Sequence, residues 1–466
     1  MSGASSLDRR SSTAQGALLK TNPPDTDSSG SKPLSCSSGS AHWRTEVLTY
    51  LDQHTADIVN QLSDFVRVPS ISGTDEEMSV LADLAGRIDG IGLETDHWQI
   101  DLSKTLAADS FPGSEVNRAE AWGLVGKLAG SSCGTGEGRS LMLNGHVDVV
   151  PPGDLHQWRR DDPFDGAVDG KSVHGRGACD MKGGLVAALW TVQAFADLKV
   201  PLRGDLLLAC VVGEEDGGLG TYATLERGWR ADGCVIPEPT SLDLVPANAG
   251  ALTFRLHLSG LSTHASRRSA GVSVIEKFWP VFAAVRSLET ARNMTTDPMM
   301  SRWDIPYPIE IGQLHAGDWS SSVPDKLIAE GRCGVRLDET PEQARQMFEE
   351  AIADACATDL WLRDHPVLVE WWGGQFASSR TDLDSPILAA MARAHASVSS
   401  YPQQRWGAPY GSDLRLMNDI GGIPTVHYGP GDVTLAHGPT ESVPIAEVLT
   451  TARALAVLAL DHCGVG

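Results

Sequence analysis

The sequence of 466 residues has few basic side chains: 37 lysines and arginines stand against 60 aspartates and glutamates, and the formal net charge is −23. A chain this acidic lacks the clustered positive charge that binds nucleic acid or an anionic membrane surface. It also lacks any run of about 18 apolar residues, so we expect no transmembrane helix. We therefore expect neither a nucleic acid nor a membrane as a partner.

Cysteine pairs at metal-binding or redox spacing are missing as well. The eight cysteines are scattered without a CxxC pair, and several, such as Cys210 and Cys234, lie in apolar strand-like runs. This pattern favours reduced, buried thiols over disulfides or a cysteine zinc site. Near the start, Arg9 and Arg10 are followed by a Ser-rich segment where a secretory or twin-arginine signal would have an apolar core. We therefore expect a cytoplasmic protein.

Short motifs of several other enzyme classes are absent or incomplete. The HExxH motif does not occur, residues 166–172 are one residue short of a Walker loop, and GRGACD lacks the third glycine of a dinucleotide fingerprint. Residues 130–134 (GSSCG) fit the G-x-S-x-G pattern, but they lie in a Gly- and Ser-rich loop before a strand. That context does not support a nucleophile elbow.

Hydropathy patterns divide the chain into regions of different character. Residues 1–40 contain twelve serines and show no periodicity, so we expect a disordered tail. Between 41 and 248, apolar strands alternate with helical segments, as in a largely parallel sheet covered by helices. The predicted strands are 141–150, 206–213 and 233–238, and the clearest helix is 183–198.

The pattern changes between residues 249 and 366. Residues 251–260 alternate apolar and polar side chains, as a half-exposed antiparallel strand does. Further strands are predicted near 309–314 and 327–337, with helices at 274–288 and 341–362. From 367 to 466, helix and short strand return. We therefore predict an α/β domain, with helices on both faces of its sheet, that is split in sequence (41–248 and 367–466) by an inserted α+β domain (249–366).

Histidine and acidic residues follow several of these strands, at the edge where open α/β sheets have their active sites. His146 and Asp148 are two residues apart on one predicted strand, so their side chains share a face. Asp148 can then accept a hydrogen bond from the His146 ring and leave the other ring nitrogen free for a metal. The remaining candidates each follow a strand or lie in a turn: Asp180, Glu214, Glu215, Glu238 and His437.

Each of these residues alone has an ordinary interpretation, such as a solvated histidine, an exposed pair of glutamates or a helix-capping aspartate. The complete set indicates a site, because two histidines and three carboxylates are ligand types that zinc accepts. A shared carboxylate allows two ions about 3.5–4 Å apart. Glu214 cannot easily bind the same ion as its neighbour Glu215, so it is free to act as a general base.

The segments GHVDVVPPGD, GRGACDMKGG, GEEDGG, PEPT and HGPTE occur in this order and resemble a di-zinc hydrolase family. That family contains acetylornithine deacetylase, succinyl-diaminopimelate desuccinylase, glutamate carboxypeptidase and aminoacylase, and the resemblance spans roughly residues 45–460. It implies a catalytic α/β domain, two Zn²⁺ ions with Co²⁺ as an alternative, and an inserted lid that commonly forms a dimer interface. It also implies these roles: His146 and Glu238 on one metal, Glu215 and His437 on the other, Asp180 bridging, Asp148 orienting His146, and Glu214 shuttling the proton.

Two more residues receive roles from the same resemblance. GLSTHAS matches the lid motif whose histidine stabilises the oxyanion, often from the partner subunit, which makes His264 the candidate. PYGSDLR resembles the segment that lines the pocket for the substrate carboxylate, which makes Arg415 the candidate anchor. A surface histidine and a salt-bridging arginine remain the alternatives. Family lids often carry an Asn before Val-Pro or Ile-Pro, whereas this chain has Ser321 and Ser322, so the acyl specificity stays open.

The predicted function is metal-dependent hydrolysis of an amide bond, by a metal-bridging water with Glu214 as the general base. We expect a deacylase of N-acyl amino acids, similar to acetylornithine deacetylase, that forms a homodimer through the lid. Cleavage of dipeptides or of C-terminal glutamate is the alternative within the same fold. A binding protein that has kept the fold and lost turnover is the alternative from another class.

Overall fold

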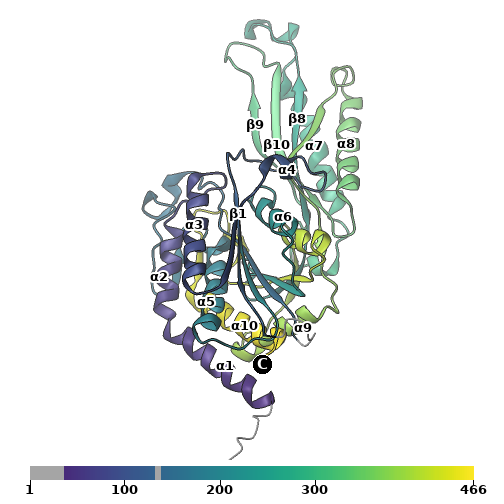
Figure 1. Cartoon of the computed structure of the whole chain (residues 1–466). Coiled ribbons are helices and arrows are strands. Elements are labelled where there is room, and N and C mark those ends of the chain that lie inside the picture. Colours follow the sequence, from purple (N-terminus) through teal and green to yellow (C-terminus); the bar gives the residue numbers. More distant parts are fainter. Residues whose placement is uncertain (1–35, 132–137) are drawn as a thin grey trace, which may run out of the picture. The chain divides into compact units, whose positions relative to one another are not determined.

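The computed structural model describes residues 36–131 and 138–466 (Figure 1). Residues 1–35 of the predicted tail lie outside the described residues, whereas residues 36–40 form the start of a helix (Cys36–Gln53), so the prediction of a tail is wrong for these five residues. Most of the GSSCG segment lies in the internal gap. Across the described residues, no helix combines the length and the apolarity that crossing a bilayer requires. Six cysteines within them are free and buried, which confirms the predicted buried thiols at those positions.

The larger sheet has nine strands, and its centre is parallel. Strands β5, β3, β6 and β14 run parallel to one another, whereas β1 and β2 on one side and β7 and β12 on the other join by antiparallel pairing. Strand β13 pairs with β7. The order is β1 (Glu94–Gln99), β2 (Trp122–Leu128), β5 (Leu206–Val211), β3 (Leu141–His146), β6 (Gly233–Ile236), β14 (Thr425–His427), β7 (Leu244–Asn248) and β12 (Ser379–Arg380), with β13 at Arg405–Ala408.

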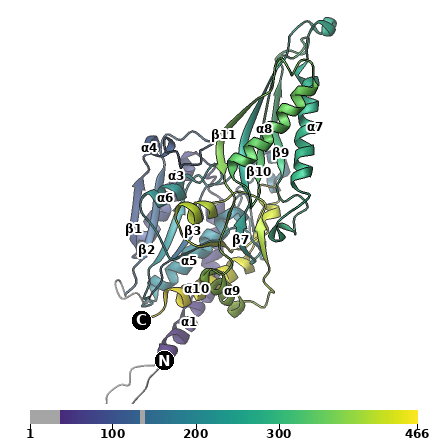
Figure 2. The ribbon, with the colours of Figure 1, turned by 90° about the vertical axis from the view of Figure 1, so that its right-hand side faces the viewer.

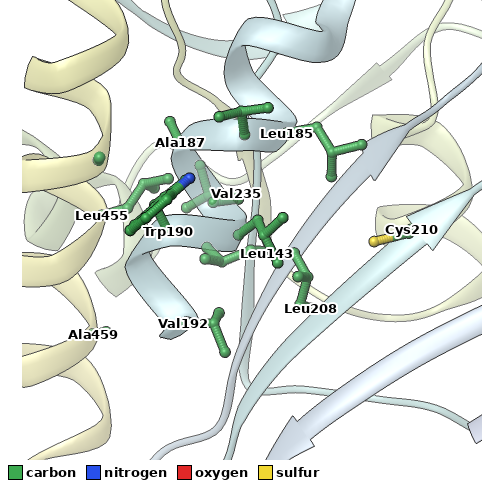
Figure 3. Packing of buried hydrophobic residues seen from close by; sticks show 14 of the residues in the cluster. Leu143, Leu185, Ala187, Trp190, Val192, Leu208, Cys210, Val235, Leu455 and Ala459 are labelled. Carbon is green, nitrogen blue, oxygen red and sulfur yellow. The ribbon is translucent and has the colours of Figure 1, made fainter. Parts of the chain in front are cut away.

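Helices from both ends of the chain surround this sheet. In chain order they are α1 (Cys36–Gln53), α2 (Thr55–Val66), α3 (Asp75–Gly90), α4 (Leu102–Leu106), α5 (Gly183–Asp197), α6 (Leu219–Glu226), α9 (Pro386–Val398) and α10 (Ile445–Cys463). On one face, Leu143 and Leu208 pack against Leu185 of α5 and, beyond it, Leu455 of α10 (Figure 3). The residues next to them in the strands, such as Met142, face a separate core with α6 on the other side. Helices on both faces confirm the predicted α/β class and explain why these strands are apolar throughout.

A second sheet of four antiparallel strands has the order β11 (Leu368–Phe376), β8 (Gly250–Ser259), β10 (Lys326–Val335) and β9 (Ile309–Ala316). Helices α7 (Val274–Arg292) and α8 (Pro341–Thr358) lie side by side against it (Figure 2). Phe254 and Phe348 meet in the core between sheet and helices. This sheet covers most of the predicted insert, and its edge strand β11 lies just beyond residue 366. The division into domains at these residues stays a prediction.

A small two-stranded pairing brings distant parts of the chain to the same place. Strands β4 (Ser172–His174) and β15 (Ser442–Pro444) pair antiparallel. As a result, the loop that carries Asp180 lies beside the loop that carries His437. Both loops meet the carboxyl edge of the large sheet, where β3 ends at His146 and Glu214 follows β5.

Candidate metal centre

Five of the predicted site residues come together in two groups that share one carboxylate. The first group is His146, Asp180 and Glu238, and the second is Asp180, Glu215 and His437. Within each group, the candidate ligand atoms all lie within 4.8 Å of one another. Because parallel strands end at one edge of a sheet, His146, Glu215 and Glu238 converge from β3, β5 and β6.

Asp180 connects the two groups through its two oxygen atoms. Its Oδ1 lies 3.2 Å from Nε2 of His146, and its Oδ2 lies 3.6 Å from Nε2 of His437. On the outer sides, Nε2 of His146 is 3.8 Å from Oε1 of Glu238, and Nε2 of His437 is 3.2 Å from Oε1 of Glu215. The carboxylate of Asp180 therefore directs one oxygen toward each histidine.

The ring of His146 is oriented by the main chain of Asp148 and not by its carboxylate. Nδ1 of His146 donates to the carbonyl oxygen of Asp148 at 2.9 Å, whereas the nearest carboxylate oxygen is 3.7 Å away. The prediction that the His146 ring bonds to the carboxylate of Asp148 is therefore wrong. The Asp148 carboxylate accepts instead from the main-chain nitrogens of Glu214 and Glu215, both at 3.2 Å, and from Ser72. Asp148 therefore connects the orientation of His146 to the position of the Glu214–Glu215 turn.

A buried ion pair that the sequence analysis did not single out holds the Asp180 and His437 loops together. Arg176 Nη1 donates to Glu441 at 2.5 Å, and its Nη2 donates to the carbonyl oxygen of His437 at 3.1 Å. The other oxygen of Glu441 accepts from the main-chain nitrogens of Cys179 and Asp180, both at 3.1 Å. Arg176 lies in GRGACD and Glu441 lies in HGPTE, so these two motifs could have indicated both residues from the sequence.

A second buried network fixes the turn that carries Glu214 and Glu215. The carboxylate of Glu77 accepts from the main-chain nitrogen of Gly213 at 2.8 Å. Arg118 forms ion pairs with both Glu77 and Asp216, at 3.3 and 2.8 Å, and all three side chains are almost completely buried. Nothing in the sequence connects Glu77 or Arg118 to the acidic turn, because Glu77 lies 136 residues before Gly213 and Arg118 lies 98 residues before Asp216.

Glu214 faces the same cavity as the two groups but belongs to neither of them. It is 7% exposed, and its carboxylate has no hydrogen-bond donor among the described residues. Burial raises its pKa well above the usual value, and the carboxylate of Asp413 adds to the effect. A buried carboxyl group whose pKa is raised in this way can hold a proton, which is the property that acid–base catalysis uses.

The cavity at the metal centre has a volume of about 290 Å³ and is lined from both sheets. Glu310 of β9 and Arg332 of β10 line it from the smaller sheet, and Tyr410, which follows β13 of the larger sheet, lines it as well. The hydroxyl oxygen of Tyr410 is buried and has no hydrogen-bond partner within the part of the chain that the structure describes. Arg332 is the only lysine or arginine among the described residues that line this cavity.

Two predicted site residues lie elsewhere. His264 is exposed outside the cavity lining, where its ring contacts Ser266 and its main chain pairs with Ser322. Arg415 is buried beside Phe376, and its Nη2 donates to the carbonyl oxygen of Gly217 at 3.1 Å. Neither residue therefore reaches the cavity at the metal centre from within its own chain.

The chemistry of the donor set fits divalent cations. Glu238 is almost fully buried; burial and the nearby charge of Asp180 raise its pKa well above the usual value. The charge of Glu215 raises the pKa of His437 above its usual value. The carboxylates of Asp180, Glu215 and Glu238 repel one another, and cations bound between them would remove that repulsion. Two imidazoles and three carboxylates are the ligands that zinc takes in proteins.

The chain is similar to several known proteins. The sequence model described as peptidase family M20/M25/M40 matches residues 142–461. The chain is 26% identical over 413 residues to N-formyl-4-amino-5-aminomethyl-2-methylpyrimidine deformylase of Bacillus subtilis, covering 82% of this chain and 88% of that protein. It is 28% identical over 344 residues to acetylornithine deacetylase of Edwardsiella ictaluri, and the match covers 70% of this chain and 82% of that protein. The crystal structure of human carnosine dipeptidase 1 superposes with a TM-score of 0.68 at 16% identity, and the match covers 90% of this chain and 99% of that one. At this identity the likeness supports the fold alone.

Proposed function

The chain belongs to peptidase family M20/M25/M40, and from this membership we propose that it is a deacylase of N-acyl amino acids. It is an enzyme of a hydrolase family that acts on amide bonds, and two similar proteins are named as a deformylase and a deacetylase. The observation that carries the proposal is the shared carboxylate of Asp180, with one oxygen toward each of two histidines. Such an arrangement suits a pair of cations and has no evident role in a structural protein.

The proposed ligands follow the two groups. His146, Asp180 and Glu238 would hold one cation, and Asp180, Glu215 and His437 the other, with zinc as the expected metal and cobalt as the alternative. When bound, two such cations lower the pKa of a water molecule toward about 7 and polarise the scissile carbonyl group. Asp148, Arg176 and Glu441 keep the ligand loops in position through the hydrogen bonds described above.

Glu214 is the proposed general base. It would take a proton from the attacking water while the water oxygen forms a bond to the amide carbon. As the carbon–nitrogen bond breaks, Glu214 returns the proton to the leaving nitrogen, so the products are an amine and a carboxylic acid that keeps the second proton of the water. Its position in the cavity, outside both ligand groups and without a hydrogen-bond donor, supports this role.

We infer that Arg332, and not Arg415, anchors the substrate carboxylate. An N-acyl amino acid carries a carboxylate, and a guanidinium binds such a group with two parallel hydrogen bonds. Arg332 lines the cavity and is 46% exposed; its Nη2 donates to Glu115 at 3.1 Å, and its Nη1 and Nε remain for a substrate carboxylate. Arg415 is buried outside this cavity. Glu310 lines the same cavity and offers a negative charge for a substrate ammonium group. This acidic residue favours a dipeptide, with its free amino group, as the second candidate substrate.

A substrate screen tests the proposal. Matched N-formyl, N-acetyl and N-succinyl amino acids and the corresponding dipeptides are incubated with the zinc- or cobalt-loaded protein. We expect hydrolysis of the N-acyl amino acids, with KM raised at least about tenfold in Arg332→Gln. Cleavage of dipeptides alone would favour the second candidate. A fully metal-loaded protein that hydrolyses none of them would favour the non-catalytic binding protein.

We also propose that the chain forms a homodimer through the smaller sheet. Strand β9 is an edge strand of that sheet, so its outer backbone groups are open to pairing. Leu314 of β9 and Ile328 of β10 are exposed, as is Trp319 between them. The predicted role of His264 depends on this dimer, because the histidine would have to reach the cavity of the partner subunit. Sedimentation of the purified protein at several concentrations tests the assembly.

A further inference from the structure

Glu115 is a carboxylate outside the smaller sheet that contacts Arg332, the proposed anchor of the substrate carboxylate. It lies in the connection between β1 and β2 of the larger sheet, whereas Arg332 lies on β10. Oε1 of Glu115 accepts from Nη2 of Arg332 at 3.1 Å and from Oγ1 of Thr253 at 2.7 Å. Thr253 and Arg332 are direct partners on β8 and β10, so one carboxylate oxygen bridges two neighbouring strands. The hydrolysis described above assigns Glu115 no role.

The position of Glu115 is fixed from two further sides. Its main-chain nitrogen donates to the carbonyl oxygen of Asp216 at 3.3 Å. Its side chain passes close to Gly373, in the irregular part of β11 between Trp371 and Gln375. A Cβ atom at Gly373 would lie only 2.4 Å from Cγ of Glu115, so this close approach requires glycine. The fold therefore defines where the carboxylate of Glu115 lies.

The contacts of Arg332 are all on one nitrogen of its guanidinium group. Nη2 donates to Glu115 and, at 3.5 Å, to the carbonyl oxygen of Glu215. Nη1 and Nε have no acceptor among the described residues, and the side chain is 46% exposed. A long exposed side chain loses conformational freedom when a ligand orders it, and this loss weakens binding. A contact that orders Arg332 beforehand reduces the loss and leaves Nη1 and Nε for a substrate carboxylate.

We propose that Glu115 is a positioning residue, which holds Arg332 in the orientation that receives the substrate carboxylate. The inference rests on the proposed function, because it takes Arg332 as the anchor. Glu115 does not line the cavity at the metal centre, so its side chain acts on the substrate through Arg332. The sign of the effect identifies this role. If Glu115 acted only by its negative charge, its removal would strengthen the binding of a carboxylate, whereas loss of a positioning residue weakens it.

Calorimetric titration of the zinc-loaded Glu214→Gln protein tests the proposal, because this background should bind a substrate without hydrolysing it. The probes are N-acetyl-L-phenylalanine and N-acetylphenethylamine, which differ only in the carboxylate. We expect Glu115→Ala to weaken binding of the first probe by about 3- to 10-fold, the effect of ordering one long side chain, and to leave the second unchanged. Glu115→Gln keeps an acceptor oxygen for Arg332 and should bind the first probe within about twofold of the background. A thermal melt checks that each variant is folded.

Two further variants complete the test. Glu330→Ala is the matched control, because Glu330 lies on β10 two residues from Arg332, pairs with Arg255 and is 21% exposed, against 23% for Glu115. It should bind both probes normally. The double variant Glu115→Ala/Arg332→Gln should bind N-acetyl-L-phenylalanine as tightly as Arg332→Gln does, because a residue that acts through Arg332 has no effect without it.

Three results would overturn the positioning role. The first is binding of N-acetyl-L-phenylalanine by Glu115→Ala that is as tight as in the background or tighter. The second is equal weakening for both probes, or for Glu115→Ala and Glu115→Gln. The third is a further loss when Glu115→Ala is added to Arg332→Gln. Failure of the proposed function has a different pattern: the background binds neither probe, or Arg332→Gln binds N-acetyl-L-phenylalanine normally, and the role of Glu115 then fails with it.

Discussion

Arg118 donates to both carboxylate oxygens of Asp216, from Nη1 at 2.8 Å and from Nη2 at 2.9 Å. The same guanidinium forms an ion pair with Glu77, whose carboxylate accepts from the main-chain nitrogen of Gly213. One arginine thereby fixes the residues on both sides of the Glu214–Glu215 pair. Glu215 belongs to a ligand group and Glu214 is the proposed base, so the relative position of the two depends on this turn.

Replacing Arg118 should therefore reduce kcat by more than the loss of folded protein accounts for. Loss of one partner of a buried ion pair costs about 3–5 kcal/mol of folding free energy, and a displacement of about 1 Å at a catalytic group can cost about 100-fold in rate. We expect kcat per folded Arg118→Gln molecule to fall by about that factor, measured with urea unfolding curves for both proteins. Arg292→Gln is the control, because Arg292 at the end of α7 forms an equally buried pair with Glu339. Equal loss of kcat in both variants would contradict a positioning role for Arg118.

Glu214→Gln separates the proton transfer from the binding of metal. A general base contributes about 10²–10⁴-fold to a rate, and the amide of glutamine cannot accept the proton. Glu214 is outside both ligand groups, so we expect the variant to lose activity in that range and to retain its metal, measured by elemental analysis after gel filtration. Glu215→Gln is the comparison and should lose metal as well. Hydrolysis at the wild-type rate by Glu214→Gln would refute the assignment of the base.

The convergence of the metal-centre residues could be predicted because it depends on a few local rules. The strands β3, β5 and β6 are short apolar runs, and polar residues after parallel strands meet at one edge. The role of the Asp148 side chain could not be predicted in the same way. The rule that alternate residues share a face holds within a strand, but β3 ends at His146, so Asp148 lies beyond it. Its carboxylate turns toward the main chain of Glu214 and Glu215 instead.

The edge strands and the position of Arg415 illustrate what sequence patterns do not contain. Strand β1 is largely polar, and strand β12 is only two residues long. Neither has a hydropathy pattern that predicts a strand, and only the pairing with β2 or β7 defines them. Arg415 belongs to PYGSDLR, which resembles a segment that lines a substrate pocket, yet its side chain lies against the ring of Phe376 and donates to the carbonyl oxygen of Gly217. Both partners are distant in sequence, so only the folded chain reveals them.

Glu441→Gln should weaken metal binding although Glu441 belongs to neither ligand group. Its carboxylate accepts from the main-chain nitrogens of Cys179 and Asp180 and pairs with Arg176, which in turn holds the carbonyl oxygen of His437. Loss of such a supporting contact typically lowers metal affinity by 10- to 100-fold, that is by about 1.4–2.8 kcal/mol. Competition with a chelating dye measures the affinity. Glu339→Gln is the control, since that buried carboxylate accepts from Arg292 and from the main-chain nitrogen of Arg336 and contacts neither ligand loop. An unchanged metal affinity in Glu441→Gln would show that the ligand loops keep their positions without it.

Because His427 is buried, we expect the protein to lose stability in acid, and His427→Gln should reduce that loss. The side chain is completely buried on β14, its Nε2 lies 3.0 Å from Oγ of Ser412, and its Nδ1 has no partner among the described residues. Burial lowers its pKa to about 3, whereas an unfolded histidine has a pKa of about 6.5. Below pH 6.5 the unfolded chain therefore binds a proton that the folded chain does not bind. Stability from this group is fully present above pH 6.5 and decreases as the pH falls from there toward 3.

Comparison of the wild type with His427→Gln isolates this contribution from that of the other titrating groups. Between pH 7.5 and pH 5.5, the wild type should lose about 1.4 kcal/mol more of its unfolding free energy than the variant, since each pH unit below the unfolded pKa contributes about that amount. Urea unfolding at both pH values measures the difference. His156→Gln, at an exposed position, should leave the pH dependence unchanged. If the wild type and His427→Gln lost equal stability over this range, His427 would have to accept its proton within the folded protein, in conflict with its burial and its unpartnered Nδ1.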